Sequence, residues 1–167
     1  EQIQSEFKKE HRPTFADFFA GAGGLSCGFT QAGFRVCFAN DFEEVCVRTY
    51  RYNHPEIPID KVVKDDIRKI ANNVQDYIDE DVDVVVGGPP CQGFSSANQQ
   101  RIIDDPRNEL YKYYIECVKK ILPKFVVMEN VRGMLKVADQ VVEDYEKKKK
   151  KKNGVTYSYA VSYKLLN

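Results

Sequence analysis

Short apolar runs alternate along the chain with segments of helical periodicity. The runs have the length of β-strands and cover residues 15–19, 35–39, 82–86 and 125–128. Between the last two runs, apolar side chains recur at the spacing of one buried helix face, at Leu110, Tyr114, Cys117, Val118 and Ile121, before Pro123 ends the pattern. Strands that alternate with helices predict a Rossmann-like α/β fold, with a mostly parallel sheet and helices on both of its faces.

The last part of the chain shows two further patterns. Residues 147–152 are an uninterrupted run of lysines, which favours a solvated, mobile loop over a phosphate contact. Asn153 and Gly154 follow, and residues 155–165 then alternate between two kinds of side chain, one of them mostly apolar. A period of two predicts a half-exposed strand for this last segment.

The composition is that of a globular protein. The chain has 167 residues, of which 43% are hydrophobic, so we expect a single domain over residues 1–167. Five cysteines without a Cys-x-x-Cys pair and only two histidines give no zinc pattern, and predict reduced thiols in a cytosolic compartment. Residues 1–13 resemble neither a secretory signal nor a transit peptide, and no apolar run reaches membrane-spanning length.

The charge balance limits the function further. The formal net charge is zero, whereas a stand-alone nucleic-acid-binding domain usually carries a basic excess that neutralises phosphates. A nucleic-acid-binding function would therefore need most of its basic surface from elsewhere.

A glycine-rich turn follows the first predicted strand. Gly21, Gly23 and Gly24 come directly after the apolar run, and a helical pattern that ends at Gly33 follows them. Glycines at such a position let a cofactor approach the backbone at the N-terminus of a helix. A tight turn that binds nothing would have the same sequence, so this pattern alone leaves both readings open.

Acidic residues stand where the next two helices are expected to begin. Asp41 follows the second strand, about 20 residues beyond the first glycine, where Rossmann-type sites place an acid on ribose hydroxyls. Its alternative role is to cap a helix that begins near Glu43, and the two roles could coexist. Asp65 and Asp66 present the same pair of roles at the following junction.

Cys91 lies in an unusual run directly after a buried strand. Residues 87–95 read Gly-Gly-Pro-Pro-Cys-Gln-Gly-Phe-Ser. Two prolines fix the backbone before the sulfur, and glycines on either side leave room for a reactant, which suits a nucleophile better than a packing residue. The alternative is a strand-to-loop turn that contains an incidental small hydrophobic side chain.

Glu129 is the acid that ends the fourth strand. The strand before Cys91 ends at the same edge of a parallel sheet, and ligands of open α/β sheets bind at that edge. The two side chains are therefore expected to face one site, although a surface carboxylate at the end of a strand would give the same pattern.

Together these segments resemble the motifs of the cytosine-C5 DNA methyltransferases. The run around Cys91, the sequence Glu129-Asn130-Val131 and the glycine turn match in order. The resemblance implies S-adenosyl-L-methionine (AdoMet) as cofactor, S-adenosyl-L-homocysteine as its product, and no metal. It implies cofactor-binding roles for Phe19, Ala20, Gly21, Gly23, Gly24, Leu25, Asp41, Phe42, Asp66, Ile67, Gly88, Pro90 and Leu110, and substrate-binding roles for Pro89, Gln92, Ser95 and Asn130. The family more often has Glu at the position of Asp41.

The implied reaction needs a nucleophile and an acid, because cytosine C5 cannot attack a methyl sulfonium unaided. The Cys91 thiolate would add to C6 while Glu129 interacts with N3, which offsets the charge that develops in the ring. A cytosine inside a duplex is inaccessible, so the resemblance implies a base flipped out of double-stranded DNA. Residues 95–107 resemble the loop that closes over DNA in this family, and Arg101 and Arg107 could contact phosphates.

Three pieces of the family are missing from this stretch of sequence. It has no Gln-x-Arg-x-Arg motif, no target-recognition domain and no C-terminal segment that completes the cofactor pocket. We therefore expect an incomplete catalytic domain that alone binds AdoMet weakly or not at all and methylates no specific site. A complementing subunit could supply the rest. The family setting implies a bacterial, cytoplasmic, nucleoid-associated enzyme, with a cognate restriction endonuclease as a further partner.

Other functions explain less of the sequence. A nicotinamide-dependent oxidoreductase would use the glycine turn and Asp41, but would leave the Pro-Pro-Cys-Gln run and Glu129 unexplained. A non-catalytic subunit with the same fold and a tRNA cytosine-C5 methyltransferase remain as alternatives. The continuation Gly93-Phe94-Ser95 is closer to the DNA enzymes.

Overall fold

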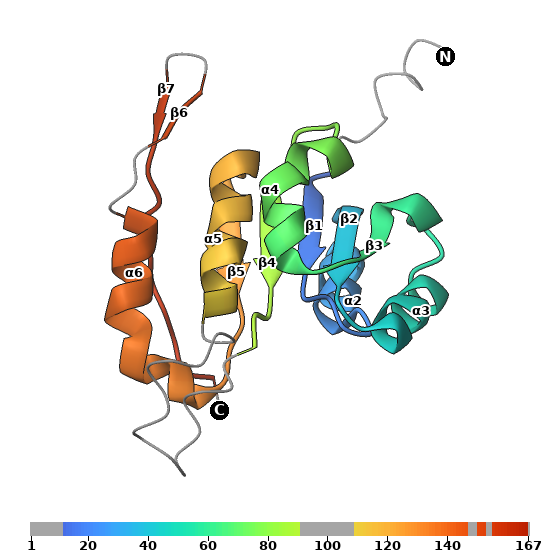
Figure 1. The fold of residues 1–167 in the computed structure, drawn as a ribbon, viewed down its shortest axis with the longest axis horizontal. Coiled ribbons are helices and arrows are strands. Elements are labelled where there is room, and N and C mark those ends of the chain that lie inside the picture. Colours follow the sequence, from blue (N-terminus) through green and yellow to red (C-terminus); the bar gives the residue numbers. More distant parts are fainter. Residues whose placement is uncertain (1–11, 91–108, 147–149, 153–154, 167) are drawn as a thin grey trace.

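The computed structural model describes residues 12–90, 109–146, 150–152 and 155–166. Its centre is a five-stranded parallel sheet in the order β3-β2-β1-β4-β5 (Figure 1). The strands are β1 (Thr14–Phe18), β2 (Arg35–Asp41), β3 (Val62–Lys64), β4 (Val84–Gly87) and β5 (Phe125–Met128). Since all five run in one direction, their carboxyl ends share one edge, and the strand order reverses between β1 and β4.

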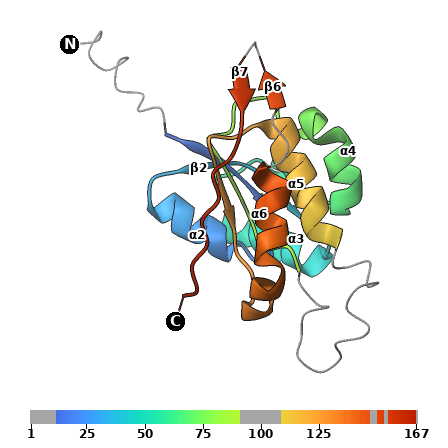
Figure 2. The ribbon, with the colours of Figure 1, turned by 90° about the vertical axis from the view of Figure 1, so that its left-hand side faces the viewer.

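Helices cover both faces of this sheet. They are α2 (Gly24–Gln31), α3 (Glu44–Asn53), α4 (Ile67–Tyr77), α5 (Leu110–Ile121) and α6 (Ala138–Glu146), with short 3-10 turns at Ile59–Lys61 and Arg132–Val137. Figure 2 shows α2 on one side of the strands and α4, α5 and α6 on the other. Each side has its own core, because successive side chains of β1 point to opposite faces: Ala16 and Phe18 pack toward α4 and α5, whereas Phe15 packs toward α2 and α3.

The predicted fold class is confirmed, and most of the predicted elements are present. The four apolar runs form β1, β2, β4 and β5, with ends that differ by no more than two residues from those expected. The helix expected between the last two runs is α5, with Tyr114, Cys117 and Val118 buried. Leu122 then takes a left-handed conformation and ends the helix before Pro123. The short strand β3 was not expected.

The prediction for the last part of the chain is largely wrong. Only Val155–Tyr157 of the alternating segment forms a strand, β7, and it pairs antiparallel with β6 (Lys150–Lys152). Part of the lysine run is therefore a strand and not a loop, whereas residues 147–149 lie outside the described residues. An Asn-Gly pair between two such segments is a hairpin signal that the sequence offered.

Strand β5 is the outermost strand on one side of the sheet. In the part of the chain that the structure describes, β5 pairs only with β4. Its side chains Phe125 and Val127 are 67% and 40% exposed. With Phe29 and Phe34 they line a shallow, mostly apolar hollow of about 450 Å³ beside α2.

Candidate active site

The glycine turn connects β1 to α2 through left-handed backbone conformations. Phe19 and Gly21 both have φ of 55°, and Gly23 has φ of 90°. A Cβ atom added to Gly21 would meet nothing within 4 Å, whereas one added to Gly23 would lie 2.3 Å from Nε2 of His54. Gly21 thus leaves open space for a ligand, and Gly23 lets the turn pack closely on the protein.

Asp41 joins this turn to the start of α3. Its Oδ2 accepts a hydrogen bond from the backbone N–H of Gly21 at 2.8 Å, and its Oδ1 accepts one from Glu43 N–H at 2.9 Å. Glu43 occupies the N-cap position of α3 without a side-chain cap of its own. The carboxylate therefore organises both turns, and its remaining lone pairs can still accept from hydroxyl groups of a ligand.

Asp66 caps α4, which is the second of the two roles predicted for it. Its Oδ1 accepts from the N–H of Arg68 at 2.9 Å, and the Arg68 guanidinium beside it lowers the pKa of this carboxyl. Asn40 fixes the same junction, because its Nδ2 donates to the carbonyls of Val63 and Asp65. Asp41 and Asp66 are thus held on adjacent strand ends.

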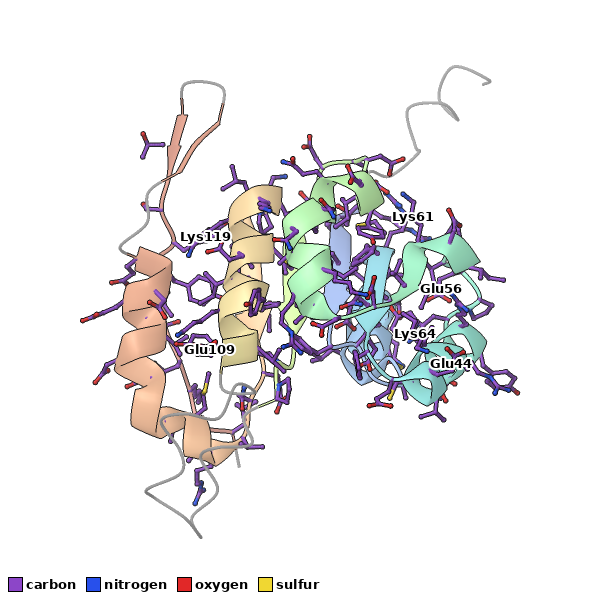
Figure 3. All side chains as sticks on the ribbon, viewed as in Figure 1. Glu44, Glu56, Lys61, Lys64, Glu109 and Lys119 are labelled. Carbon is purple, nitrogen blue, oxygen red and sulfur yellow. The ribbon has the colours of Figure 1, made fainter. Side chains whose placement is uncertain are left out.

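A hollow of about 330 Å³ lies between these strand ends, and Phe42, Glu43, Glu44, Lys64, Asp65 and Asp66 line it. The ring of Phe42 is 61% exposed. An ion pair of 3.3 Å joins Glu44 to Lys64 across its rim, and both side chains are labelled in Figure 3. An exposed aromatic ring among hydrogen-bond acceptors suits the flat base and ribose of a nucleoside.

Glu129 lies over the loop that leads to Cys91. Its N–H donates to the carbonyl of Gly87 at 2.9 Å, and its Oε2 would lie 3.3 Å from a Cβ atom added to Gly88. Asn130 donates from Nδ2 to the carbonyl of Pro89 at 2.7 Å, so the loop and the end of β5 are held together. Cys91, Gln92, Ser95 and the segment up to Arg107 lie outside the described residues.

The other expected site residues take varied positions. Ala20 is buried, and its N–H donates to the carbonyl of Asn40 at 3.0 Å. Ile67 is 3% exposed and packs in the core, so only its backbone can face a ligand. Four further expected residues are partly exposed, namely Phe19, Leu25, Pro90 and Leu110. Gly24 is exposed at the first position of α2.

Sequence reasoning missed a set of buried polar side chains beneath the glycine turn, namely Asp17, Ser26, Tyr50 and His54. Asp17 is fully buried near the carboxyl end of β1, and burial raises the pKa of its carboxyl to about 7. A signal was available, since a charged residue inside an otherwise apolar run needs a partner when buried.

Buried thiols of this domain are poor nucleophiles. Burial raises the pKa values of Cys37 and Cys117 to about 12, so they remain protonated at neutral pH. Cys27 and Cys46 are free as well. Within the described residues there is no cluster of His, Cys, Asp and Glu side chains that could hold a metal ion, and no helix there is long and apolar enough to cross a membrane.

The structure is a doubly wound α/β domain in which the glycine turn and the loop that leads to Cys91 follow β1 and β4, the two strands at the switch point of the sheet. The sequence model of the family described as C-5 cytosine-specific DNA methylase matches residues 13–167. The chain therefore belongs to the C-5 cytosine-specific DNA methylase family.

Individual relatives agree with this assignment. The chain is 36% identical over 166 residues to the Type II methyltransferase M.XorII of Xanthomonas oryzae, which covers 93% of this chain and 36% of that protein. It is 40% identical to M.FnuDI of Fusobacterium nucleatum, over 89% of this chain and 40% of the relative. The chain thus spans well under half the length of these two relatives.

Solved structures share the fold. A putative DNA modification methyltransferase from an Escherichia coli prophage superposes with a TM-score of 0.65 at 31% identity, over 80% of this chain and 36% of the other. The Dnmt2 methyltransferase of S. pombe superposes with a TM-score of 0.54 at 18% identity, over 80% of this chain and 40% of the other, which supports the fold alone.

Proposed function

We propose that residues 1–167 are the catalytic and AdoMet-binding domain of a DNA cytosine-C5 methyltransferase. The observation that carries the proposal is the position of the Glu129 carboxylate over Gly88, on the loop that leads to Cys91. Glu129 and this loop lie at the carboxyl ends of the parallel strands. The glycine turn lies there as well, and its Gly21 N–H donates to Asp41 at the end of β2. A cofactor held by the turn and a base held by the loop would meet there.

The proposed cofactor site fits the residues present. Phe42 offers a flat apolar face to an adenine, and Asp41 offers acceptors to ribose hydroxyls. Gly21 leaves the backbone of the turn open toward a methionine moiety. When bound, AdoMet supplies the methyl group.

The proposed chemistry uses two side chains. The Cys91 thiolate forms a bond to C6 of the flipped cytosine, and Glu129 offsets the negative charge at N3, so that C5 becomes nucleophilic. Once C5 carries the methyl group, a water molecule or another base takes the proton from C5. The electrons of that C–H bond restore the C5–C6 double bond as the sulfur–C6 bond breaks, which releases the thiolate. Asn130 is proposed to keep the loop at Pro89 in register with Glu129.

We place this activity on double-stranded DNA in the bacterial cytoplasm, at the nucleoid. The names of the relatives as Type II methyltransferases support this setting, together with a cognate restriction endonuclease as partner. A target-recognition region or a complementing subunit is proposed to supply the base-specific contacts.

The test is covalent trapping on DNA that contains 5-fluorocytosine, which cannot lose the group at C5 and therefore arrests the adduct. The chain, alone and together with the polypeptide that continues or complements it, is incubated with AdoMet and randomly substituted duplex DNA. We expect a denaturation-resistant protein–DNA band that Cys91→Ser abolishes. The matched control Cys27→Ser changes an exposed thiol and should leave the band unchanged.

Other outcomes separate the alternatives. An adduct that persists in Cys91→Ser would contradict the proposal, and an adduct formed only on 5-fluorocytidine tRNA would favour an RNA substrate. Binding of NADH in place of S-adenosylhomocysteine would identify an oxidoreductase. A protein that binds S-adenosylhomocysteine but forms no adduct in any combination would be a non-catalytic subunit.

A further inference from the structure

Four polar side chains from three elements form a buried network beneath the glycine turn. Asp17 lies on β1, Ser26 on α2, and Tyr50 and His54 lie on or directly after α3, all at most 4% exposed. The Ser26 hydroxyl donates to Oδ2 of Asp17 at 2.7 Å and lies 2.6 Å from the Tyr50 hydroxyl. Since Ser26 has one hydrogen and gives it to Asp17, the Tyr50 hydroxyl donates to Ser26.

The end of α3 holds the glycine turn directly. Asn53 donates from Nδ2 to the carbonyl of Ala22 at 2.9 Å, and Nε2 of His54 lies 3.0 Å from the carbonyl of Gly23. A carbonyl can only accept, so Nε2 carries the hydrogen of this bond. The ring of His54 contacts that of Tyr50, with centroids 4.5 Å apart and planes tilted by 34°, so it adjoins the hydrogen-bonded side chains of Tyr50, Ser26 and Asp17.

The surroundings leave His54 little freedom. Its Nδ1 lies 2.9 Å from Oε1 of Glu56, a side chain labelled in Figure 3. The space between the ring and the turn is too small for a Cβ atom on Gly23. Because Asp41 accepts from Gly21 N–H at the other end, the turn is clamped from both sides.

We propose that His54 is a positioning residue for the cofactor, which holds the glycine turn in its left-handed conformation through the Gly23 carbonyl. Tyr50, Ser26 and Asp17 support the imidazole from below. The inference rests on the proposed function, since it assigns the turn to AdoMet. It adds a residue that touches no ligand and yet sets the affinity of the site.

The test compares two replacements of His54 in the 167-residue chain. His54→Phe keeps a ring on Tyr50 but has no donor, whereas His54→Gln can place an amide N–H near the former Nε2. We expect His54→Phe to weaken binding of S-adenosylhomocysteine about tenfold, the size of one lost hydrogen bond. His54→Gln should stay within about threefold of the wild type. Calorimetry measures affinity, and the amide NMR signals of Gly21, Gly23 and Gly24 report the turn itself.

A control variant separates an effect on the glycine turn from a general loss of folding stability. Val118→Ala creates a cavity in the core on the other face of the sheet, so it should lower the melting temperature without changing affinity or the glycine signals. Wild-type affinity and unchanged glycine signals in His54→Phe would overturn the inference. If the wild-type chain bound no S-adenosylhomocysteine either alone or with the polypeptide that continues or complements it, the proposed function would be contradicted instead. The amide signals of the three glycines would still test whether His54 holds the turn.

Discussion

The carboxyl group of Asp17 should make the stability of this domain depend on pH. Asp17 is fully buried in β1, and burial raises its pKa from an ordinary 3.8 to about 7. The folded chain therefore holds a proton on Asp17 over a pH range in which the unfolded chain has lost it. Such a group stabilises the fold fully below the unfolded pKa, and this contribution is lost as pH rises through the folded pKa.

The size of the effect follows from the two pKa values. At 1.36 kcal/mol per pKa unit, the whole shift corresponds to about 4 kcal/mol. Between about pH 5 and about pH 8, a single group with these values loses about 2–3 kcal/mol of stabilisation. This is a large share of the 5–15 kcal/mol that holds a typical domain folded.

The assay is urea unfolding of the wild type and of Asp17→Asn across that pH range. The amide does not titrate but can still accept the hydrogen bond from Ser26, so the difference between the two proteins isolates the carboxyl. We expect the free energy of unfolding of the wild type, relative to Asp17→Asn, to fall by at least about 1 kcal/mol from pH 5 to pH 8.

A matched exposed carboxylate provides the control. Asp79 pairs with Lys61 at 2.9 Å, and the hydrogen bond from Lys61 lowers its pKa. Its stabilisation is therefore lost at lower pH, and Asp79→Asn should run parallel to the wild type over this range. Parallel curves for Asp17→Asn as well would refute the reasoning, as would an NMR titration in which the Asp17 carboxyl carbon shows an ordinary pKa.

Three further changes test the site. Gly23→Ala should destabilise the fold by about 2–4 kcal/mol in urea unfolding, because its φ is 90° and the new Cβ meets His54; Gly24→Ala, with open space around it, should cost less than about 0.5 kcal/mol, and equal costs would contradict this account. Asp41→Ala removes the acceptor for two backbone N–H groups and should weaken S-adenosylhomocysteine binding at least about tenfold by calorimetry, whereas the exposed Asp76→Ala should not. Glu129→Gln should slow adduct formation about 100-fold with cofactor affinity unchanged; an adduct at the wild-type rate would exclude its role at N3.

The parts of the fold that the sequence predicted are those with a strong local pattern. Strands β1 and β4 are mostly apolar because helices cover both faces of the sheet there, and Asp17 is the one charged residue in β1. Strand β5 is an apolar run as well, although Phe125 and Val127 are exposed. Helix α5 has a clear buried stripe. Strand β3 has only three residues, of which Val62 alone is buried, so no run marks it.

The candidate site was predictable to the extent that it follows strand ends. Asp41, Asp66 and Glu129 each come directly after or near a strand, and parallel strands bring them to one edge. The hydrogen bond that joins His54 to the glycine turn was not predictable in this way. Its two residues, His54 and Gly23, are 31 positions apart, and their contact depends on how α3 packs, which no local pattern indicates.

The position of β5 affects how this chain will behave when concentrated. Among the residues that the structure describes, β5 pairs with β4 alone, and its Phe125 and Val127 side chains are exposed. Such an outer strand is a template for another copy of the same strand. Solutions of the chain should therefore aggregate edge to edge as concentration rises. A charged residue on this strand, as in Val127→Lys, should raise solubility without altering the glycine turn after β1.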